Sequence, residues 1–106
     1  MMKIIAVTAC PAGVAHTYMA KKALEDAAAK LGHTIKVEAQ GAFGIENEIT
    51  QKEVADADVV ILAVAVGIAK TERFKGKLTV NIPINTAIKS PENLIKKIEE
   101  KFNALE

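Results

Sequence analysis

Two short apolar runs constrain the fold of this chain more than any other feature. They are Lys3–Ala9 (KIIAVTA) and Asp58–Val66 (DVVILAVAV), and both are rich in β-branched residues. Because polar residues do not alternate with apolar ones, each run predicts a strand buried on both faces, which is typical of parallel sheets. Such a sheet needs helices over both faces, and the sequence supplies segments with helical patterns between the strands.

The first helical segment follows the first run. Its apolar residues recur at helical spacing, and Gly32 stands where a left-handed C-cap would end the helix. The apolar stripe consists of Ala20, Leu24, Ala27, Ala28 and Leu31. After it, His33–Gln40 (HTIKVEAQ) alternates polar and apolar residues and predicts a second strand, and the segment 41–48 (GAFGIENE) predicts a loop.

The alternation continues in the second half of the chain. Thr50 and Glu53 form a Thr-x-x-Glu capping box, which predicts the start of a short helix before the Asp58–Val66 strand. Lys77–Ile84 (KLTVNIPI) predicts a fourth strand, with Pro83 near its end, where a missing N–H donor does least harm.

A last helix is predicted near the end of the chain, with Ser90 as its N-cap and Pro91 at its first helical position. Its inward-facing residues are predicted to be Leu94, Ile95, Ile98 and Phe102. The order of elements is therefore strand, helix, strand, short helix, strand, loop, strand, helix.

This order predicts a three-layer α/β fold, in which a four-stranded parallel sheet of strand order 2-1-3-4 is flanked by helices. A length of 106 residues suits one such domain and is too short for two, so residues 1–106 are predicted to form a single domain. Ligands of open parallel sheets bind beyond the carboxyl ends of the strands, where the strand order reverses. Cys10 directly follows the first strand and is expected at that edge.

Composition excludes several functions. Thirteen lysines and one arginine face 13 acidic residues, without a basic run, so nucleic acid is not expected as a ligand. The most apolar stretch, Asp58–Ala69, is too short to span a bilayer, and the first residues lack the apolar block of a signal peptide. We therefore expect a cytoplasmic protein that does not insert into a membrane. The single cysteine excludes an internal disulfide, and neither a metal nor a cofactor is expected.

Cys10 precedes a segment of small residues that leads into the first helix. The segment Pro11–Ala15 (PAGVA) leaves several backbone N–H groups unshielded at the positive end of the helix dipole. Such a helix start binds a phosphate-sized anion, and the same field favours the thiolate, which is the nucleophilic form of a cysteine. The alternative is that Cys10 is a small buried hydrophobic residue at the end of a strand, the commoner fate of a lone cysteine.

Other phosphate-binding patterns match less well. Neither the Walker pattern nor the Gly-x-Gly-x-x-Gly fingerprint occurs. Cysteine phosphatases place Cys-x5-Arg in such a loop, where the guanidinium holds phosphate bidentately, but the sixth residue after Cys10 is His16. Hydrolysis by a low-molecular-weight phosphatase-like enzyme is therefore less favoured than transfer, and it stays open as an alternative. A third alternative is a non-enzymatic, anion-binding regulatory module whose thiol is structural.

The segment CPAGVAHT, which spans Cys10–Thr17, resembles a known signature. It is similar to Cys-Pro-Thr-Gly-Ile-Ala-His-Thr of the fructose-type IIB domain of the bacterial phosphoenolpyruvate-dependent sugar phosphotransferase system. Similar elements follow in order, namely KVEAQGAFGIENEIT, ADVVILA and RFKGK. The resemblance covers roughly the whole chain and identifies it as a fructose-type IIB domain, which is a phosphotransferase.

The resemblance implies a phosphoryl relay. A phosphohistidine of the IIA component would donate to Cys10, and the phosphocysteine would pass the group to fructose or a fructose-like sugar held by the membrane-embedded IIC permease. Ala12 departs from the family's usual Thr, and Ala65 stands where many members have Asp, so the choice of sugar or partner stays open. The residues implied to hold the phosphoryl group are Pro11, Ala12, Gly13, Val14, Ala15, His16 and Thr17.

Several residues near this loop keep two interpretations. His16 either donates to the phosphoryl group or faces solvent, and Thr17 either binds phosphate or only starts the helix. Glu38, Gln40 and Gly41 end the second strand and either border the crevice or form a turn.

Further along the chain, Arg73 either reaches the phosphoryl group or pairs with a neighbour such as Glu72 or with a partner protein. Tyr18 and Met19 either form an apolar docking rim for the partner or belong to the core. Which sugar is carried does not follow from the sequence. The start at Met1 and the end soon after the last helix predict a free-standing subunit.

Overall fold

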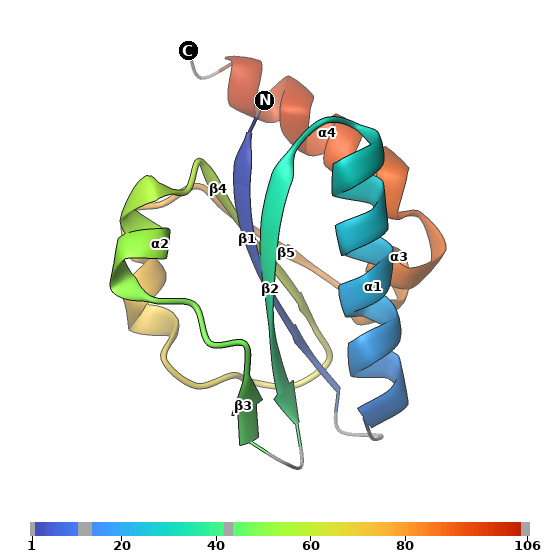
Figure 1. Cartoon of the computed structure of the whole chain (residues 1–106), viewed down its shortest axis with the longest axis vertical. Helices are drawn as coiled ribbons and strands as arrows, with labels where there is room; N and C mark the ends of the chain where they lie inside the picture. Colours follow the sequence, from blue (N-terminus) through green and yellow to red (C-terminus); the bar gives the residue numbers. More distant parts are fainter. Residues whose placement is uncertain (1, 11–13, 42–43, 105–106) are drawn as a thin grey trace.

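The computed structural model describes residues 2–10, 14–41 and 44–104. The strands and helices alternate as predicted, so the α/β class is confirmed (Figure 1). In chain order they are β1 (Lys3–Ala9), α1 (Val14–Lys30), β2 (Thr34–Gly41), β3 (Gly44–Glu46), α2 (Gln51–Asp56), β4 (Val59–Val64), the 3-10 helix η1 (Thr71–Phe74), β5 (Thr79–Ile82), α3 (Ile84–Lys89) and α4 (Pro91–Ala104).

The described residues form a five-stranded sheet in the order β3-β2-β1-β4-β5. Strands β2, β1, β4 and β5 are parallel and follow the predicted order 2-1-3-4. The predicted count of four is wrong, because β3 pairs antiparallel with β2 where a loop was expected. Left-handed backbone at Gly44 (φ 95°) and Asn47 (φ 57°) shapes the two ends of this short strand. The Asn47 side-chain amide fastens it by donating to the Val37 carbonyl at 3.0 Å.

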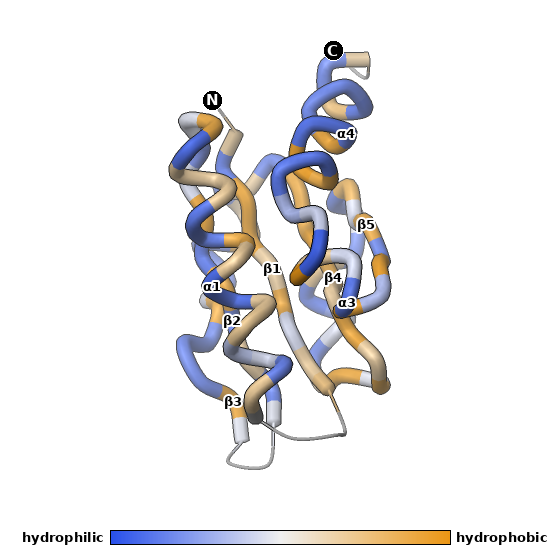
Figure 2. Tube along the Cα trace, turned by 90° about the vertical axis from the view of Figure 1, so that its right-hand side faces the viewer, coloured by the Kyte–Doolittle hydropathy of each residue, from blue (hydrophilic) through white to orange (hydrophobic). Residues whose placement is uncertain are grey.

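Helices α1, α3 and α4 cover one face of the sheet, and α2 with η1 covers the other (Figure 1). Successive residues of β1 alternate between the two cores: Ile4 and Ala6 pack under α1, whereas Ile5 and Val7 pack toward α2. Figure 2 shows apolar residues along β4 and the upper part of β1. Strand β1 has the predicted bounds and is buried on both faces, and β4 is the predicted buried strand but is shorter than Asp58–Val66, because Ala65 and Val66 lie beyond its end and are exposed.

Local end signals act as the sequence predicts. Gly32 adopts φ 82° just after α1. The hydroxyl of Thr50 accepts from the Glu53 N–H at 3.2 Å, and the Glu53 carboxylate accepts from the Thr50 N–H at 2.8 Å. Both hydrogen bonds of the capping box at the start of α2 are thus present.

The end of the fourth strand differs from its prediction. Strand β5 stops at Ile82, because Pro83 becomes the N-cap residue of the unpredicted helix α3 and its carbonyl accepts from the Thr86 N–H at 3.0 Å. Helix α3 then leads into α4. Within the ranges described above, no helix is both long and apolar enough to cross a membrane.

Candidate functional site

Cys10 is the first residue after β1, at the carboxyl edge of the sheet. It continues the Ile4 and Ala6 side of the strand and packs, partly buried, against the core under α1. Beside it, the Ala65 N–H donates to the Ala9 carbonyl at 2.9 Å and prolongs the pairing of β1 with β4. Helix α1 leads from β1 to β2 on one face, and α2 leads from β2 to β4 on the other. The thiol therefore lies at the predicted point where the strand order reverses.

His16 lies in the first turn of α1 and contacts the thiol. The distance from Cys10 Sγ to His16 Nδ1 is 3.8 Å, and the imidazole is otherwise exposed to solvent. An imidazole N–H at this position can donate to a thiolate, or to an oxygen of an anion bound on the sulfur. The geometry brings together the two residues that the sequence singles out and favours the donor role of His16.

Thr17 is the second polar residue of this turn, and it is 2% exposed. Within the described ranges its hydroxyl has no hydrogen-bond partner. A buried hydroxyl without a partner costs about 1–3 kcal/mol, so this position favours a ligand that accepts or donates a hydrogen bond. The phosphate-binding interpretation of Thr17 stays a prediction.

The other predicted loop residues are described in part. Ala15 is exposed in the first turn of α1, next to His16. The remaining members lie outside the described residues: Pro11, Ala12, Gly13 and, for its side chain, Val14.

Gln40 holds the segment that follows β4. Its amide oxygen accepts from the Ala69 N–H at 2.9 Å, and its amide nitrogen donates to the Ala69 carbonyl at 3.2 Å. In the sheet Gln40 is paired with Ala9, the residue before Cys10, and Ala9 also accepts from Ala65. The segment 65–69 is therefore held at both of its ends: Ala65 is bonded to Ala9 of β1, and Ala69 is bonded to Gln40 of β2. The backbone of Gln40 thus lies at the same edge of the sheet as Cys10, whereas its side chain lies on the α2 face, opposite to the thiol.

Glu38 is fully buried and forms an ion pair with Arg73, the single arginine of the chain. Both terminal guanidinium nitrogens donate to the carboxylate, with a distance of 2.8 Å from Nη1 to Oε1. The carboxylate also accepts from the Ile49 N–H and from the Gln40 amide, each at 2.8 Å. The guanidinium lies 4.6 Å from the centre of the Phe74 ring. This network joins β2, η1 and the segment before α2.

The ion pair corrects two sequence predictions. Arg73 neither reaches the Cys10 side nor pairs with Glu72, and Glu38 does not border the crevice. On β2 the side chains of Lys36, Glu38 and Gln40 share the α2 face, whereas Cys10 faces α1. The sequence contains one indication of this pair. An acidic residue within a strand that is covered on both faces needs a buried cationic partner, and the single arginine could supply it.

Burial raises the pKa of Glu38, but the hydrogen bonds from Arg73, Gln40 and Ile49 together outweigh that effect and hold the pKa below its ordinary value. Arg73 gives the largest of these lowering contributions. The carboxyl group is therefore ionised at neutral pH, and the network keeps full charge on both partners.

Tyr18 and Met19 lie on the outer surface of α1, where they are 39% and 51% exposed. They line a shallow depression together with Lys22 and Ile88. The core interpretation of these two residues is wrong, and the docking-rim interpretation stays a prediction.

Comparison with known proteins gives a consistent result. A family model described as "PTS system, Lactose/Cellobiose specific IIB subunit" matches residues 5–97. The chain is 56% identical over 99 residues to PTS system fructose-like EIIB component 2 of Escherichia coli strain K12, an alignment that covers 93% of each chain. The solution structure of the Enzyme IIB subunit of the PTS system from the same strain has a TM-score of 0.91 at 44% identity, over 97% of this chain and 95% of that one.

A longer relative is similar over the same region. The Fructose-like PTS system EIIBC component of Escherichia coli strain K12 is 46% identical over 99 residues. The alignment covers 92% of this chain and 20% of that protein.

Proposed function

Because this chain belongs to the IIB family of the sugar phosphotransferase system (PTS), in its fructose-like branch, and is a phosphotransferase, we propose that Cys10 carries the phosphoryl group. The proposed cradle is the start of α1 and the loop before it. Its members are Pro11, Ala12, Gly13, Val14, Ala15, His16 and Thr17.

The transfer consists of two displacements at phosphorus. The Cys10 thiolate attacks the phosphorus of a phosphohistidine on the IIA component, so that an S–P bond forms as the P–N bond breaks, and the released imidazole takes up a proton. A hydroxyl of the sugar held by IIC then attacks the same phosphorus. An O–P bond forms, the S–P bond breaks and the thiolate is restored, while the hydroxyl proton leaves to a base on the permease side.

The observation that carries this proposal is the placement of the thiol at the start of α1. Cys10 Sγ lies 3.8 Å from His16 Nδ1, and the buried hydroxyl of Thr17 belongs to the same turn. The first N–H groups of a helix lack partners within the helix, and together with the dipole they favour an anion. A phosphoryl group on sulfur, with a charge of about −1.5 to −2, would meet hydrogen-bond donors there.

The phosphatase alternative is weakened by the position of Arg73. Such enzymes hold phosphate with an arginine of the loop, but the one arginine of this chain is bound to Glu38 on the opposite face of the sheet. His16 takes the place that the arginine would occupy. A site built this way favours holding the phosphoryl group for transfer over hydrolysing it.

We propose a fructose-like sugar as the final acceptor, with IIA as donor and IIC as the membrane partner. The names of the relatives support a fructose-like sugar. The relative in which IIB and IIC are joined in one EIIBC component supports IIC as the membrane partner. The family model's description names lactose and cellobiose instead. Transport assays with fructose and cellobiose as competing substrates therefore test this part.

Intact-mass measurement tests the role of Cys10. The protein is incubated with phosphorylated IIA, and one phosphate adduct is expected on the unchanged chain and on His16→Ala, but not on Cys10→Ser. The His16→Ala adduct should form or decay at a different rate, because a donor beside the sulfur is lost.

An adduct that persists in Cys10→Ser would place the phosphoryl group elsewhere and overturn the proposal. Hydrolysis of an aryl phosphate by the isolated protein, lost in Cys10→Ser, would favour the phosphatase alternative. Equal activity of Cys10→Ser in every phosphoryl assay would favour a structural thiol.

A further inference from the structure

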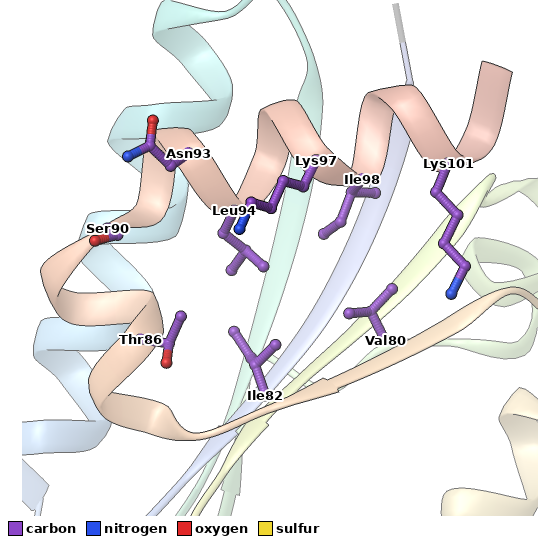
Figure 3. Close-up of a pocket in the computed structure, with 9 residues that line it drawn as sticks. All are labelled: Val80, Ile82, Thr86, Ser90, Asn93, Leu94, Lys97, Ile98 and Lys101. Carbon is purple, nitrogen blue, oxygen red and sulfur yellow. The ribbon is translucent and has the colours of Figure 1, made fainter. Parts of the chain in front are cut away.

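A groove between α4 and the edge strand β5 is built from residues other than those around Cys10. It has a volume of about 460 Å³. Its charged lining residues are Lys97 and Lys101; Figure 3 shows the Lys101 side chain extending from α4 toward β5 and the Lys97 side chain lying along α4 beside Leu94. Its apolar residues are Val80, Ile82, Leu94 and Ile98. The groove thus combines an apolar floor with two amines.

Strand β5 is an edge strand of the sheet, and within the described residues no further strand pairs with its outer side. The Val60 N–H of β4 donates to the Leu78 carbonyl at 2.8 Å, and Val60 is in register with Thr79. In a parallel pair, hydrogen bonds alternate from residue to residue, so the backbone groups of Thr79 and Asn81 point away from β4. They are free to pair with an added strand.

The two lysines set the charge of a fitting partner. Neither Lys97 nor Lys101 forms an ion pair in the part of the chain that the structure describes. Residues four apart on a helix are about 6 Å apart along its axis, and alternate residues of an extended strand are about 6.6–6.8 Å apart. Carboxylates two residues apart on an extended segment therefore match the spacing of the two lysine positions along α4, from which the flexible side chains reach into the groove.

We propose that this groove binds an extended acidic segment of another protein. The segment adds to the sheet by pairing its backbone with Thr79 and Asn81, as in other cases of strand addition at an open edge. Two alternate carboxylates meet Lys97 and Lys101, and a neighbouring apolar side chain packs on Leu94. This inference is independent of whether Cys10 carries a phosphoryl group. The competing explanation is that the lysines only keep other edges from pairing with β5.

A synthetic peptide tests the proposal. The probe is the capped peptide Ile-Thr-Glu-Thr-Glu-Thr-Ile, whose symmetric sequence fits either strand direction, and the control peptide replaces both glutamates by glutamines. NMR titration of the labelled protein is expected to shift the amides of Thr79, Asn81 and the groove face of α4. The glutamine peptide should bind about tenfold more weakly, because two charge pairs are lost.

Matched variants separate site binding from general charge. Lys97→Glu with Lys101→Glu should weaken binding by about tenfold or more, whereas Lys75→Glu with Lys96→Glu makes the same change of charge at exposed lysines outside the groove and should not. Asn81→Pro removes an outward N–H at a position where an edge strand tolerates proline, so it should abolish peptide binding and leave the circular dichroism spectrum unchanged.

Three results would overturn the proposal. One is the absence of peptide-induced shifts at β5, which would leave the lysines with a protective role only. Another is equal weakening by the two double variants, which would show attraction to net charge rather than to the groove. The third is a concentration-dependent dimer in sedimentation that Lys97→Glu with Lys101→Glu abolishes, because a second copy would then occupy the groove.

Discussion

The two faces of the sheet are stabilised by different means. Under α1, α3 and α4 the core is a continuous apolar cluster, which includes Leu24, Ile61 and Ile95. Under α2 and η1 a smaller apolar cluster adjoins the buried ion pair of Glu38 and Arg73. Apolar packing is non-directional, whereas a hydrogen-bonded ion pair fixes the atoms that it joins.

This difference bears on the site. Cys10 lies on the apolar face, beside the first turn of α1. The polar network lies on the opposite face, and through Gln40 it holds Ala69 and the segment beside Cys10. Glu38 also binds the one arginine of the chain, on the face opposite to the thiol. The polar network on the α2 face thus helps to position the segment that lies beside the thiol.

Removing Arg73 is expected to have the largest effect. Arg73→Met leaves Glu38 buried without its cation, which should lower the free energy of unfolding by about 3–5 kcal/mol. Urea denaturation followed by circular dichroism measures this. The control is the double variant Arg73→Met with Glu38→Gln, which removes both charges but keeps an acceptor for the Ile49 N–H and should recover a large part of the loss. A cost below about 1 kcal/mol for Arg73→Met would show that the ion pair does not stabilise this face.

The matching change on the apolar face is Leu24→Ala. Leu24 is fully buried under α1, and its truncation should cost about 3 kcal/mol through lost apolar contact and a cavity. The cost should be the same at pH 7 and at mildly acidic pH. The cost of Arg73→Met, in contrast, should shrink on acidification, because Glu38 can then take up a proton. Urea denaturation of both variants at the two pH values makes this comparison, and parallel pH dependence would contradict the division between the faces.

The sequence carries the information for the parts of the fold that depend on local patterns. The unbroken apolar runs predict β1 and β4 as central strands, and the end of β1 places Cys10 at the edge of the sheet. The capping box predicts the start of α2, and Gly32 predicts the end of α1. In each case the physical cause lies within a few neighbouring residues.

The features that were missed depend on contacts between distant residues. Glu38 and Arg73 are 35 positions apart, so no local pattern pairs them. Strand β3 is three residues long, too short for a periodic signal, and exists because β2 offers it an edge. Pro83 is the N-cap residue of helix α3, but a proline at this place in the sequence is equally typical of the end of a strand.

The smallest expected effect is the order in which the two faces lose protection in acid. Hydrogen bonds lower the pKa of Glu53, the largest effect coming from Lys36 and a smaller one from the Thr50 backbone. The pKa of Glu38 is likewise lowered by hydrogen bonds from Arg73 and its neighbours. Both carboxyl groups lie on the α2 face. A carboxyl whose folded pKa is lowered adds stability above its unfolded pKa, about 4.3, and this stability is lost as the pH falls through the folded pKa.

Hydrogen exchange followed by NMR at pH 5.5 and pH 3.5 measures that order. On going to the lower pH, after correction for the intrinsic exchange rate, the amide of Val54 in α2 should lose more protection than that of Leu24 in α1. Glu53→Gln should reduce this difference, because glutamine can still accept the Thr50 N–H but does not titrate. If both amides lose protection equally in the unchanged protein, acid acts on the domain as one cooperative unit, and the polar network does not make the α2 face separately sensitive to pH.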